Sequence, residues 1–95
     1  MQLEFTGPVF HWRGPAPYFF VAVPPEEAEE LQEAAALVSY GWGMVPATVR
    51  IGATEWTTSL WPREGSYVVP LKDAIRNAEE IGEGDVVTIR LTVVM

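Results

Sequence analysis

The sequence predicts a small, mainly β protein with two short helices, folded as a closed or double-split β-barrel with a pseudo-two-fold ββαβ repeat. Its 95 residues supply one hydrophobic core at most, so a single domain over residues 1–95 is expected. Eight prolines and eight glycines separate short runs of β-branched and aromatic residues, a pattern typical of small barrels and sandwiches. Two stretches of the chain also repeat the same order of residue types, which predicts two related halves.

The first half contains a strand followed by a helix. Aromatic and β-branched residues from Tyr18 to Val23 predict a strand that ends at Pro24, because proline has no N–H to donate to a sheet. Pro25 suits the first position of a helix, which we predict from about residue 25 to about residue 38. The apolar stripe of this helix consists of Leu31, Ala35 and Val38.

Alternation of polar and apolar residues predicts the remaining strands. They are expected over residues 47–51, 55–61, 66–69 and 86–94. A second helix is predicted from about residue 71 to about residue 81, where apolar residues recur at helical spacing, with Gly82 as its end. Gly84-Asp85 is expected to form the turn before the last strand.

The internal repeat is carried by two pairs of segments. Residues 23–28 and 69–74 share the order Val, Pro, two variable residues, acid, Ala, and the runs Thr48-Val49-Arg50-Ile51 and Thr88-Ile89-Arg90-Leu91 match in type. Neither half could cover its own sheet, so the halves are expected to bury their sheets against each other in one barrel. Arg50 and Arg90 are then expected to approach each other at the seam.

The second half resembles the swapped-hairpin unit of AbrB/MazE-type transcription factors, in the stretch from Tyr67 to Arg76 and in Gly84-Asp85. The whole chain is more similar to an uncharacterised bacterial family, number 1905 in the series of domains of unknown function. That resemblance rests on Phe5, the strand end at Val23-Pro24, the strand from Trp56 to Leu60 with its following hairpin, and the segments just named. It implies a double-split β-barrel and no particular activity.

Composition narrows the functional classes. Six Lys and Arg against 13 Asp and Glu give a formal net charge of -7, which opposes binding to phosphate backbones, so nucleic acid is not an expected partner. The chain has no cysteine and a single histidine, so neither a metal site nor a cofactor is expected. No segment has the length and apolarity of a membrane helix or signal peptide, and the expected location is the cytoplasm.

Catalytic motifs are not found in the sequence, and we therefore expect a protein that is not an enzyme. His11 is the only imidazole that could transfer a proton, and an enzyme that uses His11 stays open as a less favoured alternative. The five Glu residues of the first predicted helix are interpreted as a solvated face, because they lack the turn residues of a calcium loop.

The segment Tyr40-Gly41-Trp42-Gly43-Met44 is the strongest candidate for ligand contact. Glycines on both sides of Trp42 allow backbone conformations that other residues avoid, and they pack poorly, so an indole that served only the core would be better held by a stiffer frame. Two interpretations of Trp42 stay open. Its indole contacts a ligand, or it folds back as a lid over the end of the barrel.

Aromatic and basic residues suggest a second part of the site. Trp61 shares strand parity with Thr57 and Ser59 and is expected to face outward or line a groove, whereas Trp56 is expected in the core. Three basic residues are expected to bind the ligand together with this face: Arg50 on a strand, and Lys72 and Arg76 as an exposed i, i+4 pair on the second helix. The alternative, that they are ordinary surface cations paired with neighbouring Glu residues, stays open.

These observations predict a non-enzymatic module that binds a small ligand or a protein partner. The predicted ligand-binding residues are Tyr40, Trp42, Arg50, Thr57, Ser59, Trp61, Lys72 and Arg76. The ligand is expected to be anionic or sugar-like, and the protein to be a monomer or a weak homodimer. A transcription-factor-like barrel that binds nucleic acid is the main alternative, and it rests on fold analogy alone.

Overall fold

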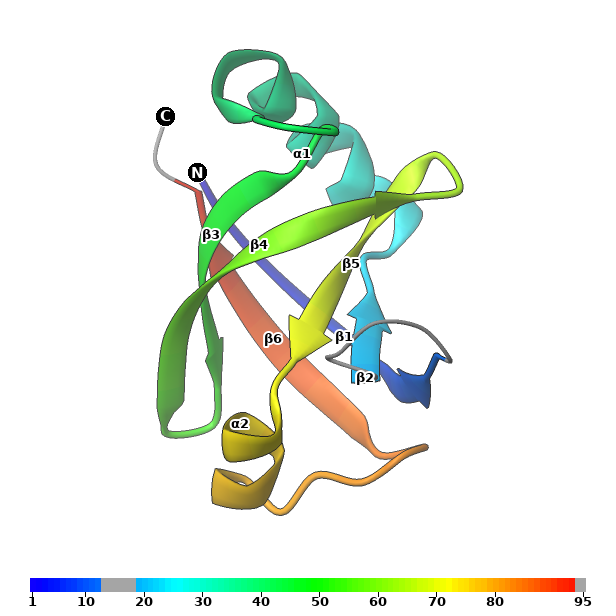
Figure 1. Cartoon of the computed structure of the whole chain (residues 1–95), viewed down its shortest axis with the longest axis vertical. Helices are drawn as coiled ribbons and strands as arrows, with labels where there is room; N and C mark the ends of the chain where they lie inside the picture. The colour runs from blue at the N-terminus through cyan, green and yellow to red at the C-terminus, as the bar shows by residue number, and fades with distance from the viewer. Residues whose placement is uncertain (13–18, 94–95) are drawn as a thin grey trace.

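A computed structural model, which describes residues 1–12 and 19–93, shows a closed antiparallel barrel of six strands in the order β1-β2-β5-β4-β3-β6. Figure 1 shows the strands wrapping around one core, with a helix at each end. The elements are β1 (Gln2–His11), β2 (Phe19–Ala22), α1 (Pro25–Val38), β3 (Val45–Ile51), β4 (Thr54–Arg63), β5 (Ser66–Leu71), α2 (Asp73–Ala78) and β6 (Val86–Thr92). The predicted mainly β barrel is confirmed.

The two halves of the chain have the same element order and matching strand pairings. Each half contributes two strands, a helix and a strand. β1 pairs with β2 as β4 pairs with β5, and β1 pairs with β6 as β4 pairs with β3. Only β1 with β2 and β4 with β5 pair within a half, and the other four pairings join the halves: β1 with β6, β3 with β4, β2 with β5 and β3 with β6. This is the pairing that the predicted ββαβ repeat requires, because exchanging the halves leaves every pairing unchanged.

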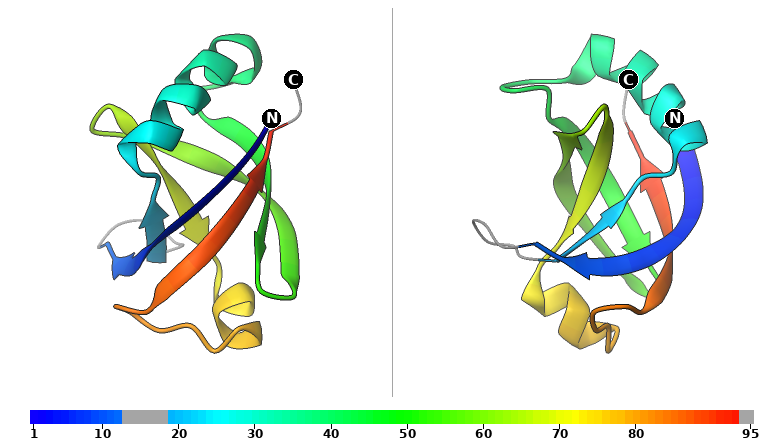
Figure 2. Two further views of the ribbon diagram at one scale, coloured as in Figure 1. Left: turned by 180° about the vertical axis from the view of Figure 1, so that it is seen from behind. Right: turned by 90° about the vertical axis from the view of Figure 1, so that its right-hand side faces the viewer.

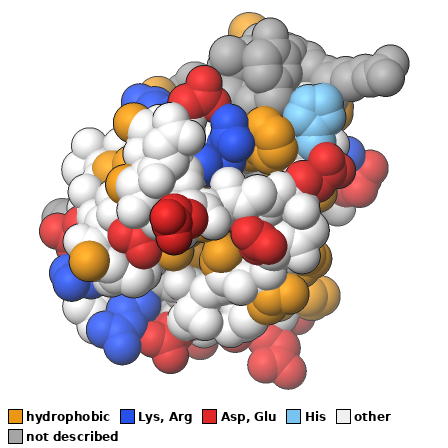
Figure 3. Space-filling view, turned by 90° about the horizontal axis from the view of Figure 1, so that it is seen from below, with side chains coloured by type: hydrophobic (Ala, Val, Ile, Leu, Met, Phe, Trp, Pro, Cys, Tyr) orange, Lys and Arg blue, Asp and Glu red, His pale blue; other side chains and the backbone are white. Residues whose placement is uncertain are grey.

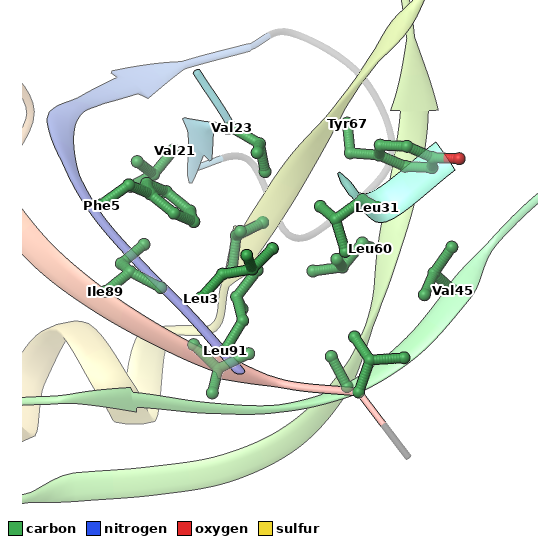
Figure 4. Packing of buried hydrophobic residues seen from close by; sticks show 14 of the residues in the cluster. Leu3, Phe5, Val21, Val23, Leu31, Val45, Leu60, Tyr67, Ile89 and Leu91 are labelled. Atoms are coloured by element: carbon green, nitrogen blue, oxygen red, sulfur yellow. The ribbon is translucent and has the colours of Figure 1, made fainter. Parts of the chain in front are cut away.

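The core fills the barrel with apolar side chains from alternate strand positions. In β6, Val87, Ile89 and Leu91 are buried while the residues between them are exposed, as the alternation predicted. No charged or polar residue is buried among the residues that the structure describes. Figure 4 shows side chains of this cluster from several strands and from α1 gathered inside the ribbon. Burial of apolar surface is therefore the main source of stability.

The helix α1 lies over one end of the barrel and α2 lies at the other, as Figure 2 shows from two sides. α1 begins at Pro25 and ends at Val38, in agreement with the sequence prediction. It places four residues in the core: Ala28, Leu31, Ala34 and Ala35. Leu31, with no exposed surface, is the only large side chain among them, so it closes this end of the barrel.

Strand β1 is longer than the sequence patterns indicated. No strand bounds are predicted before Tyr18, yet β1 pairs with β6 from Gln2 to Pro8 and with β2 from Val9 to His11. Gly7 and Pro8 interrupt the alternation of apolar and polar residues, so the sequence pattern does not indicate the full strand. Gly7 faces inward, and a Cβ built on it would lie 3.2 Å from Val21 Cγ1, so the close approach of two strands explains the glycine.

The predicted bounds of the second helix, 71–81, were wrong. Leu71 belongs to β5, where it pairs with Phe19, and α2 covers only Asp73–Ala78. The helix ends before Gly82 because Glu80 adopts a left-handed conformation with φ of 54°. The N–H of Ile81 then donates to the Arg76 carbonyl at 2.8 Å, as in a Schellman motif. Gly82 instead donates to the Asp85 carboxylate in the following turn, which was predicted correctly.

The other strand boundaries differ by a few residues. Pro62 lies inside β4, and the hairpin turn consists of Glu64 and Gly65, which both have positive φ as a type I′ turn requires. Pro70 was predicted to end its strand but lies within β5, opposite Phe20. The ends of two predicted strands, at Tyr18 and Val94, lie outside the described residues.

Candidate functional site

A groove opens on the outside of the barrel where β4 and β5 separate. Their ladder runs from Arg63 and Ser66 to Trp61 and Val68, and beyond this point β4 continues along β3 while β5 continues along β2. Pro70 lies just past the end of the ladder. Proline has no N–H, but β5 makes no hydrogen bond to β4 at this position, so none is lost. The groove has a volume of about 510 Å³ and is lined by Pro46, Thr57, Thr58, Ser59, Trp61, Pro70 and Lys72.

Trp61 is held by an outer aromatic cluster, which we define as Phe10, Trp12, Phe20 and Trp61. The Trp61 ring lies 5.2 Å from the Phe20 ring and 6.5 Å from the Trp12 ring, between ring centroids. Phe20 has no exposed surface although it lies outside the core cluster, so these neighbours bury it against the outer wall. The Arg63 guanidinium covers the cluster, 4.9 Å from the Trp12 ring centroid.

The groove combines three kinds of chemistry. Trp61 contributes a half-buried indole whose ring position is fixed by its neighbours. Thr57 and Ser59, on the same face of β4, contribute hydroxyl groups that donate and accept hydrogen bonds. Lys72 follows β5 and contributes an exposed ammonium group.

A tight turn, Tyr40 to Met44, packs beside the groove. Backbone hydrogen bonds join Tyr40 and Met44 in both directions at 3.0 Å, and Gly41 and Gly43 have φ of 58° and 88°, which favour glycine. The Tyr40 hydroxyl forms a short hydrogen bond with the Ser59 hydroxyl. Ser59 lines the groove, so Tyr40 connects the turn to it.

Trp42 stands at the tip of this turn with 94% of its surface exposed. It therefore does not fold back as a lid over the barrel, and it does not line the groove. The turn is held by backbone hydrogen bonds and by Tyr40, none of which depends on the indole.

Replacing Trp42 by alanine is expected to change the free energy of unfolding by less than about 1 kcal/mol, because an exposed side chain contributes little packing. Urea denaturation followed by circular dichroism measures the change. A loss of about 3 kcal/mol or more would mean that the indole is packed against the barrel after all.

Two predicted basic residues lie away from the groove. Arg50 is on the outer face of β3 and lines a different hollow with Arg90. Arg76 is not an exposed partner of Lys72, because its guanidinium lies 3.7 Å from the Phe19 ring centroid and pairs with Asp73. Only 19% of the Arg76 side chain is exposed. Phe19 projects toward the interior at the α2 end, so a contact distant in sequence draws Arg76 inward.

The structure thus brings Thr57, Ser59, Trp61 and Lys72 into one groove and places Tyr40 beside it. Sequence patterns did not indicate the other lining residues, Pro46, Thr58 and Pro70. The prolines carried a usable signal, since a proline inside a strand marks a place where the ladder is interrupted.

Other features of the chain were also located. Trp56 packs partly buried against the core. His11 ends β1, with its ring 5.2 Å from the Phe19 ring. Figure 3 shows the α2 end of the molecule, where basic side chains are interspersed with acidic ones and do not form a continuous patch. Among residues 1–12 and 19–93, no group of three or more His, Cys, Asp or Glu side chains has the arrangement of a metal site.

A family model for a domain of unknown function, DUF1905, matches residues 5–91. The chain belongs to the DUF1905 family. The matched range includes every residue that lines the groove, from Pro46 to Lys72. A search of curated proteins found no match to the chain. In the described parts of this DUF1905 domain, neither helix is long and apolar enough to cross a membrane.

Proposed function

We propose that this DUF1905 domain is a binding module that takes a small, hydroxylated, negatively charged molecule, such as a sugar acid, into the groove between β4 and β5. One observation carries the proposal. Where the two strands separate, the groove collects an indole, two outward hydroxyl groups and an ammonium group. Binding sites of this kind typically join an apolar surface to a few polar groups that fix the orientation of the ligand.

Each group has a separate role. The Trp61 indole offers a flat apolar surface on which the C–H face of a sugar ring packs. Thr57 and Ser59 exchange hydrogen bonds with ring hydroxyls, and Lys72 pairs with the negative group. Because Phe20 and Trp12 already hold the indole, little side-chain entropy is lost when a ligand binds.

Glucuronate is the probe that we would use, with glucose as the neutral comparison. Titration followed by amide NMR is expected to give saturable shifts at Thr57, Ser59, Trp61 and Lys72, with tighter binding of glucuronate than of glucose. Trp61→Ala is expected to weaken glucuronate binding by about tenfold or more, which corresponds to about 1.4 kcal/mol. Lys72→Gln is expected to remove the preference for glucuronate.

Trp42→Ala is the matched control, since it removes the same side chain outside the groove. It is expected to leave glucuronate binding unchanged. Trp61→Phe keeps an aromatic ring and is expected to retain the fold and part of the affinity, which separates binding from stability. Equal losses in Trp42→Ala and Trp61→Ala, or no saturable shift at millimolar glucuronate, would contradict the proposal.

A further inference from the structure

A row of four charged residues crosses the outer face of the barrel on the side formed by β1, β6, β3 and β4. Strand register places Glu4 opposite Arg90, and Arg90 opposite Arg50. On the far side, Arg50 lies opposite Glu55. The neighbours Val49 and Leu91 are buried in the core, so the charged residues face outward. Two arginines are thus adjacent at the seam between the halves, as the repeat predicted.

Like charges directly opposite each other destabilise a sheet. Arg50 and Arg90 nevertheless lie opposite each other, and a hydrogen bond to another group orients each guanidinium. Arg90 Nε donates to a Glu4 carboxylate oxygen at 2.7 Å, and Arg50 Nε donates to the Gly52 carbonyl oxygen at 3.1 Å. Each guanidinium is therefore anchored through Nε. Within the described part of the chain, the terminal Nη atoms of Arg50 and the second side of the Arg90 fork have no hydrogen-bond acceptor.

The surface around the two arginines is hollowed and supplies further donors. A hollow of about 510 Å³ is lined by both arginines, by Thr48 and Thr92, and also by the carboxylates Glu4 and Glu55. Thr48 pairs with Thr92 one step along the same face from Arg50 and Arg90. Two guanidinium groups and two hydroxyl groups therefore border one shallow site. Guanidinium forks match the oxygens of a phosphate group in geometry and charge.

We infer that Arg50 and Arg90 form a binding site for the phosphate group of a small phosphorylated molecule, with Thr48 and Thr92 as additional donors. The inference does not depend on the groove between β4 and β5, because none of these four residues lines that groove. Glu4 holds Arg90 in place and competes with the phosphate for it.

A single phosphate group fits this row better than a nucleic acid strand. Glu4 and Glu55 flank the arginines on both sides, so the positive charge does not extend along a track. The net charge of -7 also opposes a polyanion, which gains affinity by contacting many cations at once.

The experiment is an amide NMR titration of the full chain at constant ionic strength, with inorganic phosphate, glycerol phosphate and chloride in separate arms. Both phosphates are expected to shift β3 and β6 resonances saturably, and chloride is not. Stronger binding of glycerol phosphate identifies an organic phosphate as the ligand class, and equal binding identifies the free anion; either result supports the phosphate site.

Arg50→Gln and Arg90→Gln are each expected to weaken phosphate binding by about tenfold or more. Glu4→Gln is expected to strengthen it, a change that a merely structural role of the Glu4–Arg90 pair would not produce. Arg63→Gln is the control, because it removes a cation that lines neither hollow, and it is expected to leave phosphate binding unchanged.

Several results would overturn the inference. They are the absence of saturable shifts, equal shifts with chloride, weaker binding in Glu4→Gln, and unchanged binding in Arg50→Gln. If the affinity for single-stranded oligothymidylates rose steeply with their length, the ligand of this site would be a nucleic acid and not a small phosphorylated molecule. Glucuronate binding at the Trp61 groove is measured separately, so either proposal can fail while the other stands.

Discussion

Phe20→Ala is expected to lower the free energy of unfolding by about 3–5 kcal/mol, the range typical of large aromatic residues removed from a buried position. Phe20 points away from the core, yet none of its surface is exposed. It contacts the rings of Phe10, Trp12 and Trp61, with centroids 5.2–6.0 Å away. Its removal would leave a cavity between the outer aromatic cluster and the barrel wall.

Urea denaturation of Phe20→Ala and Trp42→Ala, followed by circular dichroism, tests this expectation. The two variants each lose one aromatic side chain, one fully buried and one 94% exposed. If both lost less than about 1 kcal/mol, the outer cluster would be a loose surface contact. The indole N–H resonance of Trp61 in the NMR spectrum gives a second signal, since loss of Phe20 also frees one neighbour of the indole that lines the groove.

Leu31→Ala is expected to lower the free energy of unfolding by about 2–5 kcal/mol. Leu31 is the single large side chain that α1 inserts into its end of the barrel, and Figure 4 shows it among Leu60, Tyr67 and Val45 of the strands. Alanine at this position would leave a cavity that the small residues Ala28 and Ala34 cannot fill.

Leu37→Ala is the control for Leu31→Ala, because it makes the same chemical change in the same helix at a side chain that is 73% exposed. The control is expected to change stability by less than about 0.5 kcal/mol. Thermal unfolding should separate the two clearly, since each kcal/mol shifts the melting temperature by about 4–8 °C in a domain of this size. Equal melting temperatures would contradict the role of Leu31 as the closure of the barrel.

The parts of the fold that depend on neighbouring residues were predictable. α1 was found within its observed bounds because Pro25 and the apolar spacing are local signals. Thr57, Ser59 and Trp61 were placed on one outward face because strand parity is also local. The buried face of β6 followed from the same alternation.

The parts of the fold that depend on contacts between residues distant in sequence were not predictable. Leu71 has helical spacing with later residues, but pairing with Phe19 keeps it in β5. The local sequence indicates that Arg76 is a surface cation, whereas in the structure the Phe19 ring lies beneath its guanidinium. The groove forms because β4 and β5 pair over three residues and then pair with different strands. This arrangement depends on how the whole barrel closes, so the sequence of one segment does not predict it.

The pairing of β1 with β6 has a consequence for how the chain folds during synthesis. Gln2 pairs with Thr92, so the seam joins residues separated by nearly the whole domain. Until β6 leaves the ribosome, β1 has an unpaired edge, and unpaired edges attract other strands. Contacts of such long range also slow folding, because loop closure must come before any stabilisation. The edge of β1 that faces β6 therefore stays open to pairing with strands of other chains until β6 has been synthesised.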